Sequence, residues 1–150
     1  MKKIYQKYSS LEDLLIEFLP ADDADLQKSI VGWRKMFFSF KKNERVRKHF
    51  SDPESNSACK RINMFLRWMI RKDEFGVDFG IWKKINPSQL VCPIDVHVAR
   101  VAYRFDLLKR NMIDWQAALE LTNELRKLDP TDPVKYDFAL FGLGVVEKFN

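Results

Sequence analysis

The chain has 150 residues and a formal net charge of +5, and 46% of its residues are hydrophobic. This length suits a single domain with one packed core, and the apolar content excludes intrinsic disorder. Two cysteines, Cys59 and Cys92, are too few for a disulfide scaffold or for the four thiolates of an iron–sulfur cluster. Since two histidines are the only other soft ligands, we expect no metal site and no cofactor.

The cellular location and the partner class follow from two further patterns. There is no apolar signal region at the N-terminus and no apolar run near the roughly 20 residues of a membrane span, so we expect a cytoplasmic protein without a membrane partner. Positive charge is concentrated in residues 34–72, which carry 12 Lys/Arg against 3 Asp/Glu. Such a segment attracts polyanions, nucleic acid among them, although a solvated basic face is a common alternative.

Glycine is scarce and strand-like alternation is rare, so the sequence predicts an all-α protein. A first helix starts at Ser9 or Ser10 and ends at Pro20, and a second runs from about residue 22 or 23 to 40. Residues 41–50 are basic and polar, which is typical of a helix end and an exposed connection. Asn56 or Ser57 is expected to cap a third, largely apolar and therefore buried helix over residues 58–70.

The second half of the chain begins with a long connection over residues 73–93, with a short helical piece expected around residues 80–85. Three further helices follow, at about 95–108, 114–128 and 134–146. The segment Asp129–Pro133 contains two prolines and two aspartates, and it opens the last of these helices. No repeat or domain linker interrupts the pattern, so we expect residues 1–150 to form one helical domain.

The most informative motif is Cys-Pro-Ile-Asp-Val-His-Val-Ala-Arg-Val-Ala-Tyr-Arg, at residues 92–104. It places Asp95 at the start of an amphipathic helix, where backbone N–H groups and the helix dipole keep a carboxylate ionised. The run resembles the catalytic-aspartate segment of the helix-hairpin-helix/GPD DNA glycosylases, in which the aspartate faces the sugar of a flipped nucleotide. A plain helix cap is the alternative interpretation of Asp95.

The resemblance extends to a lysine. Bifunctional enzymes of this superfamily carry a lysine early in a buried helix, where it forms a Schiff base with the sugar, and Lys60 has a similar position. Such a lysine must lose its proton before it attacks. Partial burial beside other cations favours this loss, and Arg61 is the expected neighbouring cation. The 35 residues between Lys60 and Asp95 exceed the usual separation, as they do in archaeal 8-oxoguanine glycosylases. An ordinary exposed helix lysine is the alternative.

Similarity to the 8-oxoguanine enzymes also implies a base pocket on the last helix. Asp137 and Phe141 lie four residues apart on one helix face, and by this resemblance they bind the edge and the face of a flipped purine. The alternatives are a core phenylalanine and a solvated or capping aspartate.

Further residues of the chain are candidates for contact with DNA. Lys48, Arg61, His97 and Arg104 are the candidate contacts to the DNA backbone, although His97 is equally suited to bracing its helix. Trp68 and Trp82 are either wedges that enter the base stack or core anchors.

The chain also departs from the superfamily pattern. The usual hairpin before the lysine is Leu-Pro-Gly-x-Gly, whereas residues 54–59 contain no glycine, which puts the standard phosphate contact in doubt. Three segments resemble an uncharacterised bacterial family of the superfamily: Asn-Ser-Ala-Cys-Lys-Arg, Met-Phe-Leu-Arg-Trp-Met and Asp-Pro-Val-Lys-Tyr-Asp-Phe-Ala-Leu-Phe-Gly. Members of that family extend further at the N-terminus. We therefore expect the C-terminal part of a two-lobed fold, lacking the first helices, which pairs with a second copy or exposes apolar surface.

Together these features predict an all-α, helix-hairpin-helix/GPD-like protein that acts on double-stranded DNA with a damaged base. The expected reaction is excision of an oxidised purine by Lys60, with Asp95 stabilising the sugar cation, followed by strand cleavage. Two alternatives stay open. One is a non-catalytic nucleic-acid-binding relative, and the other is a structural or protein-interaction domain.

Overall fold

The computed structural model describes residues 2–20, 25–39, 44–47 and 49–147. Over these residues it is all-α, as predicted, and its only extended pairing is an isolated antiparallel bridge between Lys72 and Phe79. The elements are α1 (Lys2–Lys7), α2 (Leu11–Ile16), α3 (Gln27–Ser39), α4 (Glu44–Arg47), α5 (Lys60–Ile70), the 3₁₀ turn η1 (Pro87–Gln89), α6 (Val96–Arg104), α7 (Trp115–Leu128), the 3₁₀ turn η2 (Pro133–Tyr136) and α8 (Asp137–Val146).

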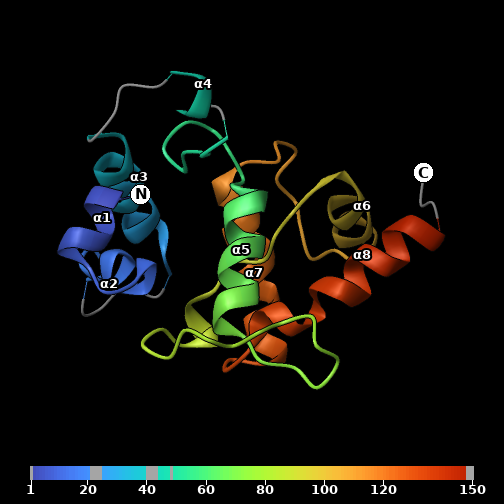
Figure 1. Cartoon of the computed structure of the whole chain (residues 1–150). Helices are drawn as coiled ribbons and strands as arrows, with labels where there is room; N and C mark the ends of the chain where they lie inside the picture. Colours follow the sequence, from blue (N-terminus) through green and yellow to red (C-terminus); the bar gives the residue numbers. More distant parts are fainter. Residues whose placement is uncertain (1, 21–24, 40–43, 48, 148–150) are drawn as a thin grey trace.

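The helices fall into three groups across the molecule. The three N-terminal helices α1 to α3 gather on one side, α5 stands in the middle, and α6 and α8 lie on the other side (Figure 1). A core cluster of buried side chains runs through all three groups, from Ile4 and Leu14 through Leu66 to Val98 and Leu140. No described helix is long and apolar enough to cross a membrane.

The N-terminal helices follow the local sequence signals in part. Ser10 caps α2 as predicted, since its Oγ accepts a hydrogen bond from the Asp13 backbone N–H at 3.0 Å. The expected start of the second helix, at residue 22 or 23, lies outside the described residues. The helix α3 begins at Gln27. The carboxylate of Asp25 accepts a hydrogen bond from the Gln27 N–H at 2.7 Å. The helices α1 and α4 were not predicted, because each is short and carries no distinct apolar period.

The central helix α5 is buried on one face by Ile62, Leu66 and Ile70, at helical spacing. The predicted cap at Asn56 or Ser57 is wrong. Cys59 holds that position with a left-handed backbone, φ 51°, and Ser57 instead accepts the Cys59 N–H at 3.2 Å.

An aromatic cluster joins α3 to α5. Trp33 of α3 stacks on Phe65 of α5, with ring centroids 6.1 Å apart, and Trp82 packs edge-on against both. Trp82 is therefore a core anchor, one of the two roles considered for it.

The connection over residues 73–93 folds back along the end of α5. The expected helical piece around residues 80–85 is absent from the described structure, because Gly80 has φ +56° and the Trp82 N–H bonds to the Met69 carbonyl at 2.8 Å. The helical turn occurs later, at η1, where Pro87 occupies the first position and Gln89 completes a capping box with Asn86.

The C-terminal helices begin at acidic caps. Asp95 accepts backbone N–H groups at the start of α6, as its position predicted, and Asp114 does the same at the start of α7, close to the predicted helix start. The helices α6 and α8 then pack against each other more extensively than any other pair. Gly144 makes this approach feasible, because a Cβ atom there would lie 2.5 Å from the His97 carbonyl oxygen.

Candidate active site

The fold brings Lys60 and Asp95 together, although 35 residues separate them in the sequence. Lys60 Nζ donates to Asp95 Oδ2 at 2.5 Å, and the two side chains are 37% and 18% exposed. Lys60 is the first residue of α5, whereas Asp95 caps the N-terminus of α6, so two helix starts meet at this point. A substrate in solvent can therefore reach both functional groups.

Asp95 is held as a carboxylate. Burial raises its pKa, but the hydrogen bond from Lys60 and those from the Val98 and His97 backbone N–H groups outweigh that effect, and the pKa lies below the usual range. The two backbone N–H groups donate to Oδ1 at 3.0 and 2.9 Å, which leaves Oδ2 to Lys60. The helix cap considered as an alternative and the ion pair are thus both present, on different oxygens of one carboxylate.

A cavity of about 190 Å³ opens beside Lys60, along the same face of α5. Its polar wall comes from Lys60, Arg67 and Asp137. The rest of the wall is apolar and comes from Met64, Trp68, Val77, Pro93, Val98, Phe138 and Phe141. Apolar walls with a few converging polar groups are typical of small-molecule sites.

Asp137 and Phe141 both line this cavity. Phe141 is 39% exposed, its ring centroid lies 5.6 Å from Lys60 Nζ, and His97 packs edge-on against it at 6.0 Å. Asp137 is buried and binds Arg67, with Oδ2 accepting from Nη1 at 2.5 Å, so it is neither the solvated residue nor the cap considered as alternatives. Burial raises the pKa of Asp137, and the nearby Arg67 and Lys60 oppose that rise.

Arg67 is the main functional residue that the sequence did not reveal. It lies two turns after Lys60 on α5, it is 2% exposed, and its guanidinium carbon lies 4.0 Å from the Phe138 ring centroid. Its Nε and Nη2 atoms donate to Asp78 Oδ2 at 3.2 and 3.1 Å. Arginine inside an apolar helix face is itself a signal of a buried ion pair, but only the fold identifies the partners.

The four candidate contacts to the DNA backbone have different surroundings. Lys48 lies outside the described residues. Arg61 and Arg104 are exposed, the former beside Lys60 and the latter at the far end of α6 from Asp95. His97 packs between α6 and α8, and its Nδ1 is buried without a hydrogen-bond partner in the described structure. The helix-bracing role considered for His97 thus has structural support.

The glycine-free segment before α5 still takes glycine-like backbone angles. Asn56 and Cys59 have φ values of 54° and 51°, in the left-handed region that glycine occupies most readily. Cys59 is buried, and burial raises its pKa to about 11, while burial also raises the pKa of Cys92 well above normal. Neither thiol is therefore a thiolate nucleophile near neutral pH.

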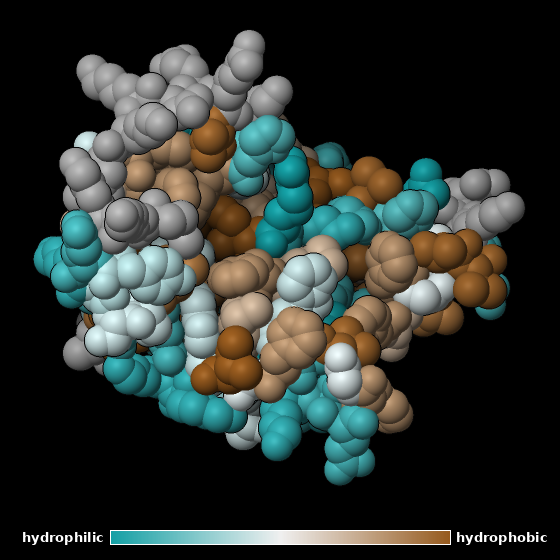
Figure 2. Space-filling view, in the orientation of Figure 1, coloured by the Kyte–Doolittle hydropathy of each residue, from teal (hydrophilic) through white to brown (hydrophobic). Residues whose placement is uncertain are grey.

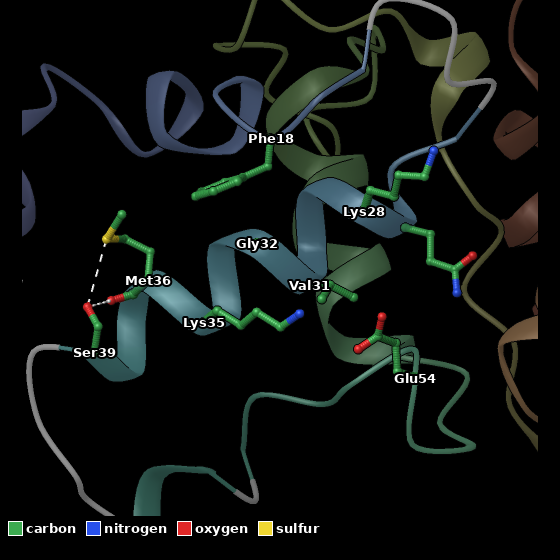
Figure 3. Close-up of a pocket in the computed structure, with 9 residues that line it drawn as sticks. Phe18, Lys28, Val31, Gly32, Lys35, Met36, Ser39 and Glu54 are labelled. Atoms are coloured by element: carbon green, nitrogen blue, oxygen red, sulfur yellow. Dashed lines mark hydrogen bonds between the residues drawn. The ribbon is translucent and has the colours of Figure 1, made fainter.

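A larger hollow of about 790 Å³ lies elsewhere, on α3. Phe18 lies across Gly32 at its upper edge, while Lys35, Met36 and Glu54 border it from α3 and the turn before α5 (Figure 3). Neither Lys60 nor Asp95 is part of its lining. We therefore place the candidate site in the smaller cavity.

Comparison with known proteins identifies the family of the chain. No curated protein and no solved structure matches the chain. Residues 1–146 match the family described as protein of unknown function, DUF2400. Since this match covers nearly the whole sequence, the chain belongs to the DUF2400 family.

Proposed function

We propose that the protein is a DNA repair glycosylase with lyase activity, which excises an oxidised purine such as 8-oxoguanine through a lysine Schiff base. The observation that carries the proposal is the pair of Lys60 and Asp95, 2.5 Å apart at an apolar-walled cavity. The resemblance of residues 92–104 to the catalytic segment of helix-hairpin-helix/GPD glycosylases supports the assignment, as does the concentrated positive charge of residues 34–72.

In this mechanism Lys60 is the nucleophile. Asp95 takes a proton from the Lys60 ammonium, and the freed amine bonds to C1′ of the deoxyribose as the bond from C1′ to the base nitrogen breaks. Asp95 gives that proton to the departing base and so returns to the carboxylate. The sugar ring then opens as a proton moves from Nζ to the ring oxygen, which leaves a protonated Schiff base between C1′ and Nζ. Loss of a C2′ proton then breaks the bond from C3′ to its oxygen, which cleaves the strand by β-elimination.

Asp95 also acts on the transition state. Its depressed pKa keeps it negative near neutral pH, beside the carbon that becomes positive as the base departs. Flipping the nucleotide out of the duplex costs a few kcal/mol, least where the base is poorly paired. The cavity is smaller than the roughly 300–1,000 Å³ of pockets for drug-sized ligands, which suits a single base.

Asp137 and Phe141 are the proposed base pocket. Arg67 fixes Asp137 through Oδ2, so the other carboxylate oxygen is the one that accepts from a purine edge. Phe141 stands near Lys60 Nζ and is accessible enough to stack on the base.

Borohydride trapping tests the proposal. The parent protein and its Lys60→Arg and Lys60→Ala variants are incubated with labelled duplexes that contain 8-oxoguanine or an abasic site. We expect a covalent adduct from the parent alone, because Lys60→Arg keeps the positive charge beside Asp95 but cannot form the Schiff base. Lys127→Ala, which removes an exposed lysine of α7 that does not line the cavity, is the control and keeps the adduct.

Two results would contradict the proposal. An adduct that persists in both Lys60 variants would assign the chemistry to another amine. Salt-sensitive binding of the duplex with no adduct in the parent would instead indicate the non-catalytic nucleic-acid-binding relative.

A further inference from the structure

The loop after α5 has a fixed backbone. Asp73 Oδ1 accepts the Phe75 and Val77 N–H groups at 2.9 and 3.2 Å, and its Oδ2 accepts the Asp78 N–H at 3.2 Å. The Phe79 N–H bonds back to the Trp68 carbonyl at 2.8 Å, and Lys72 pairs with Phe79 in the isolated bridge. Residues 72–79 therefore form a closed turn that is tied to the end of α5.

This turn holds a large apolar side chain in solvent. Phe75 is 90% exposed, and it precedes Gly76, whose φ of +75° makes the sharp bend at the tip. Phe79 and Ile81 are also exposed, while the residues between and after them, Gly80 and Trp82, are buried. Single exposed apolar residues are common. A phenylalanine this exposed on a fixed turn, however, contributes no buried apolar surface to the stability of the fold.

The same turn forms part of the candidate active site. Val77, two residues after Phe75, lines the cavity that contains Lys60. Asp78 is completely buried and binds Arg67, which lines that cavity as well. The position of Phe75 relative to the cavity is thus set by its near neighbours in the chain.

We propose that Phe75 is a wedge that enters the base stack of duplex DNA and fills the space left by the nucleotide flipped into the cavity. The inference rests on the proposed function and deepens it by naming the residue that separates the bases. Apolar side chains inserted between base steps unstack them and stabilise a distorted duplex. Trp82 cannot take this role because it is buried in the aromatic cluster, and Trp68 is part of the cavity wall.

The charges around the turn favour DNA over an apolar protein partner. Lys72 and Lys83 are exposed on either side of the exposed apolar residues, as phosphate contacts beside a wedge require. Glu74 is also exposed and opposes phosphate, so the tip itself binds through apolar contact with bases. Asp73 is engaged by three backbone N–H groups, and although desolvation raises its pKa, those bonds leave it below the usual range.

A fluorescence measurement tests the wedge without any chemistry. A Lys60→Ala protein is mixed with a duplex that carries 2-aminopurine next to an 8-oxoguanine, because 2-aminopurine brightens when it loses its stacking partner. We expect Lys60→Ala to raise the fluorescence, Lys60→Ala with Phe75→Leu to keep most of the rise, and Lys60→Ala with Phe75→Ser to abolish it. Phe79→Ser in the same background, which removes an exposed phenylalanine outside the tip, keeps the rise.

Excision measured in the Lys60 protein gives the second readout. Phe75→Ser is expected to slow removal of a paired lesion by about tenfold or more, while trapping at a preformed abasic site, which has no base to displace, changes by less than about threefold. Because Phe75 is nearly fully exposed, its substitution leaves folding intact.

The failures of the two proposals are distinguishable. An unchanged fluorescence rise and unchanged excision in Phe75→Ser would overturn the wedge alone. An equal loss in Phe79→Ser would also overturn it, in favour of general apolar contact. A rise that depends on Phe75 in a protein that forms no adduct would support the wedge and overturn only the glycosylase chemistry.

Discussion

Asp95 combines two roles on separate oxygens, and substitution can separate them. Asparagine is as good a helix cap as aspartate, so Asp95→Asn keeps the cap of α6 while it removes the charge beside Lys60. We expect Asp95→Asn to lose the borohydride-trapped adduct. Its free energy of unfolding should stay within about 1 kcal/mol of the parent's, because the lost ion pair is partly exposed. Asp95→Ala also loses the cap and costs a further 0.5–2 kcal/mol, roughly. Urea unfolding beside trapping measures both effects.

The pH dependence of stability provides a check on the same residue. The pKa of Asp95 is lower in the folded protein than the value of about 3.9 expected for an unfolded aspartate. Its contribution to the free energy of unfolding is therefore fully present above that value, and it is lost as pH falls through the folded-state pKa. The stability difference between the parent and Asp95→Asn should shrink between pH 7 and pH 3. A difference that grows on acidification would contradict the assignment.

The residues of the candidate site were predictable to different degrees. Asp95 could be proposed from its local motif at a helix start, whereas Lys60 was proposed only from the similarity of its position to the superfamily lysine. Arg67 and Asp78 could not, since a buried ion pair is defined by partners that come together only in the fold. Arg67 reaches Asp137 across 70 positions of the sequence, and no local pattern specifies such a contact.

At the scale of elements, the packing of α6 on α8 positions Phe141 near Lys60, and one glycine controls it. A methyl group at Gly144 would meet the backbone of His97, which cannot rotate away. We expect Gly144→Ala to lower the free energy of unfolding by about 1–3 kcal/mol, as overpacking does, and to reduce trapping with it.

Gly142 provides the matched control on the same helix. A Cβ atom there meets nothing within 4 Å, so Gly142→Ala should stabilise α8 by roughly 0.5–1 kcal/mol. Thermal or urea unfolding of the two variants tests the pair. A similar response of both would show that helix propensity, not the contact with His97, determines the effect.

Elements with a local cause were predicted best. Ser10 and Asp114 cap helices through their own side chains, and their signals lie within three residues. The start of α5 was misplaced because Cys59 adopts a left-handed conformation that its sequence does not favour, and burial of its side chain compensates. The connection over residues 73–93 was misjudged because hydrogen bonds to the end of α5 determine its path.

At the scale of the whole molecule, α8 leaves apolar surface in solvent. Leu143, Val145 and Val146 are exposed along it, and Figure 2 shows apolar residues over the arm that ends the described chain. Pairing with a second copy stays a prediction.

The buried ion-pair network connects the parts of the molecule that form the site. Arg67 of α5 and Arg71, which caps the end of that helix, both bind Asp78 of the following turn. Arg67 also binds Asp137 of α8, and Arg71 binds Asp132 at 2.7 Å. Arg67 and Asp137 are both buried, so removal of Arg67 leaves the Asp137 carboxylate without its ion-pair partner, while Asp78 keeps Arg71. This network fixes the cavity wall, the turn of residues 72–79 and the start of α8 relative to α5.

The change in the free energy of unfolding when this network is broken tests whether its ion pairs hold the helices of the site together. We expect Arg67→Met to lower the free energy of unfolding by about 3–5 kcal/mol, because Asp78 and Asp137 lose their shared partner in a buried position. Lys127→Ala, which removes the exposed pair with Glu124, should change it by less than about 1 kcal/mol. Urea unfolding gives both values. An effect of Arg67→Met as small as that of Lys127→Ala would mean that apolar packing alone holds α8 against α5, and that the arginine is dispensable for the geometry of the site.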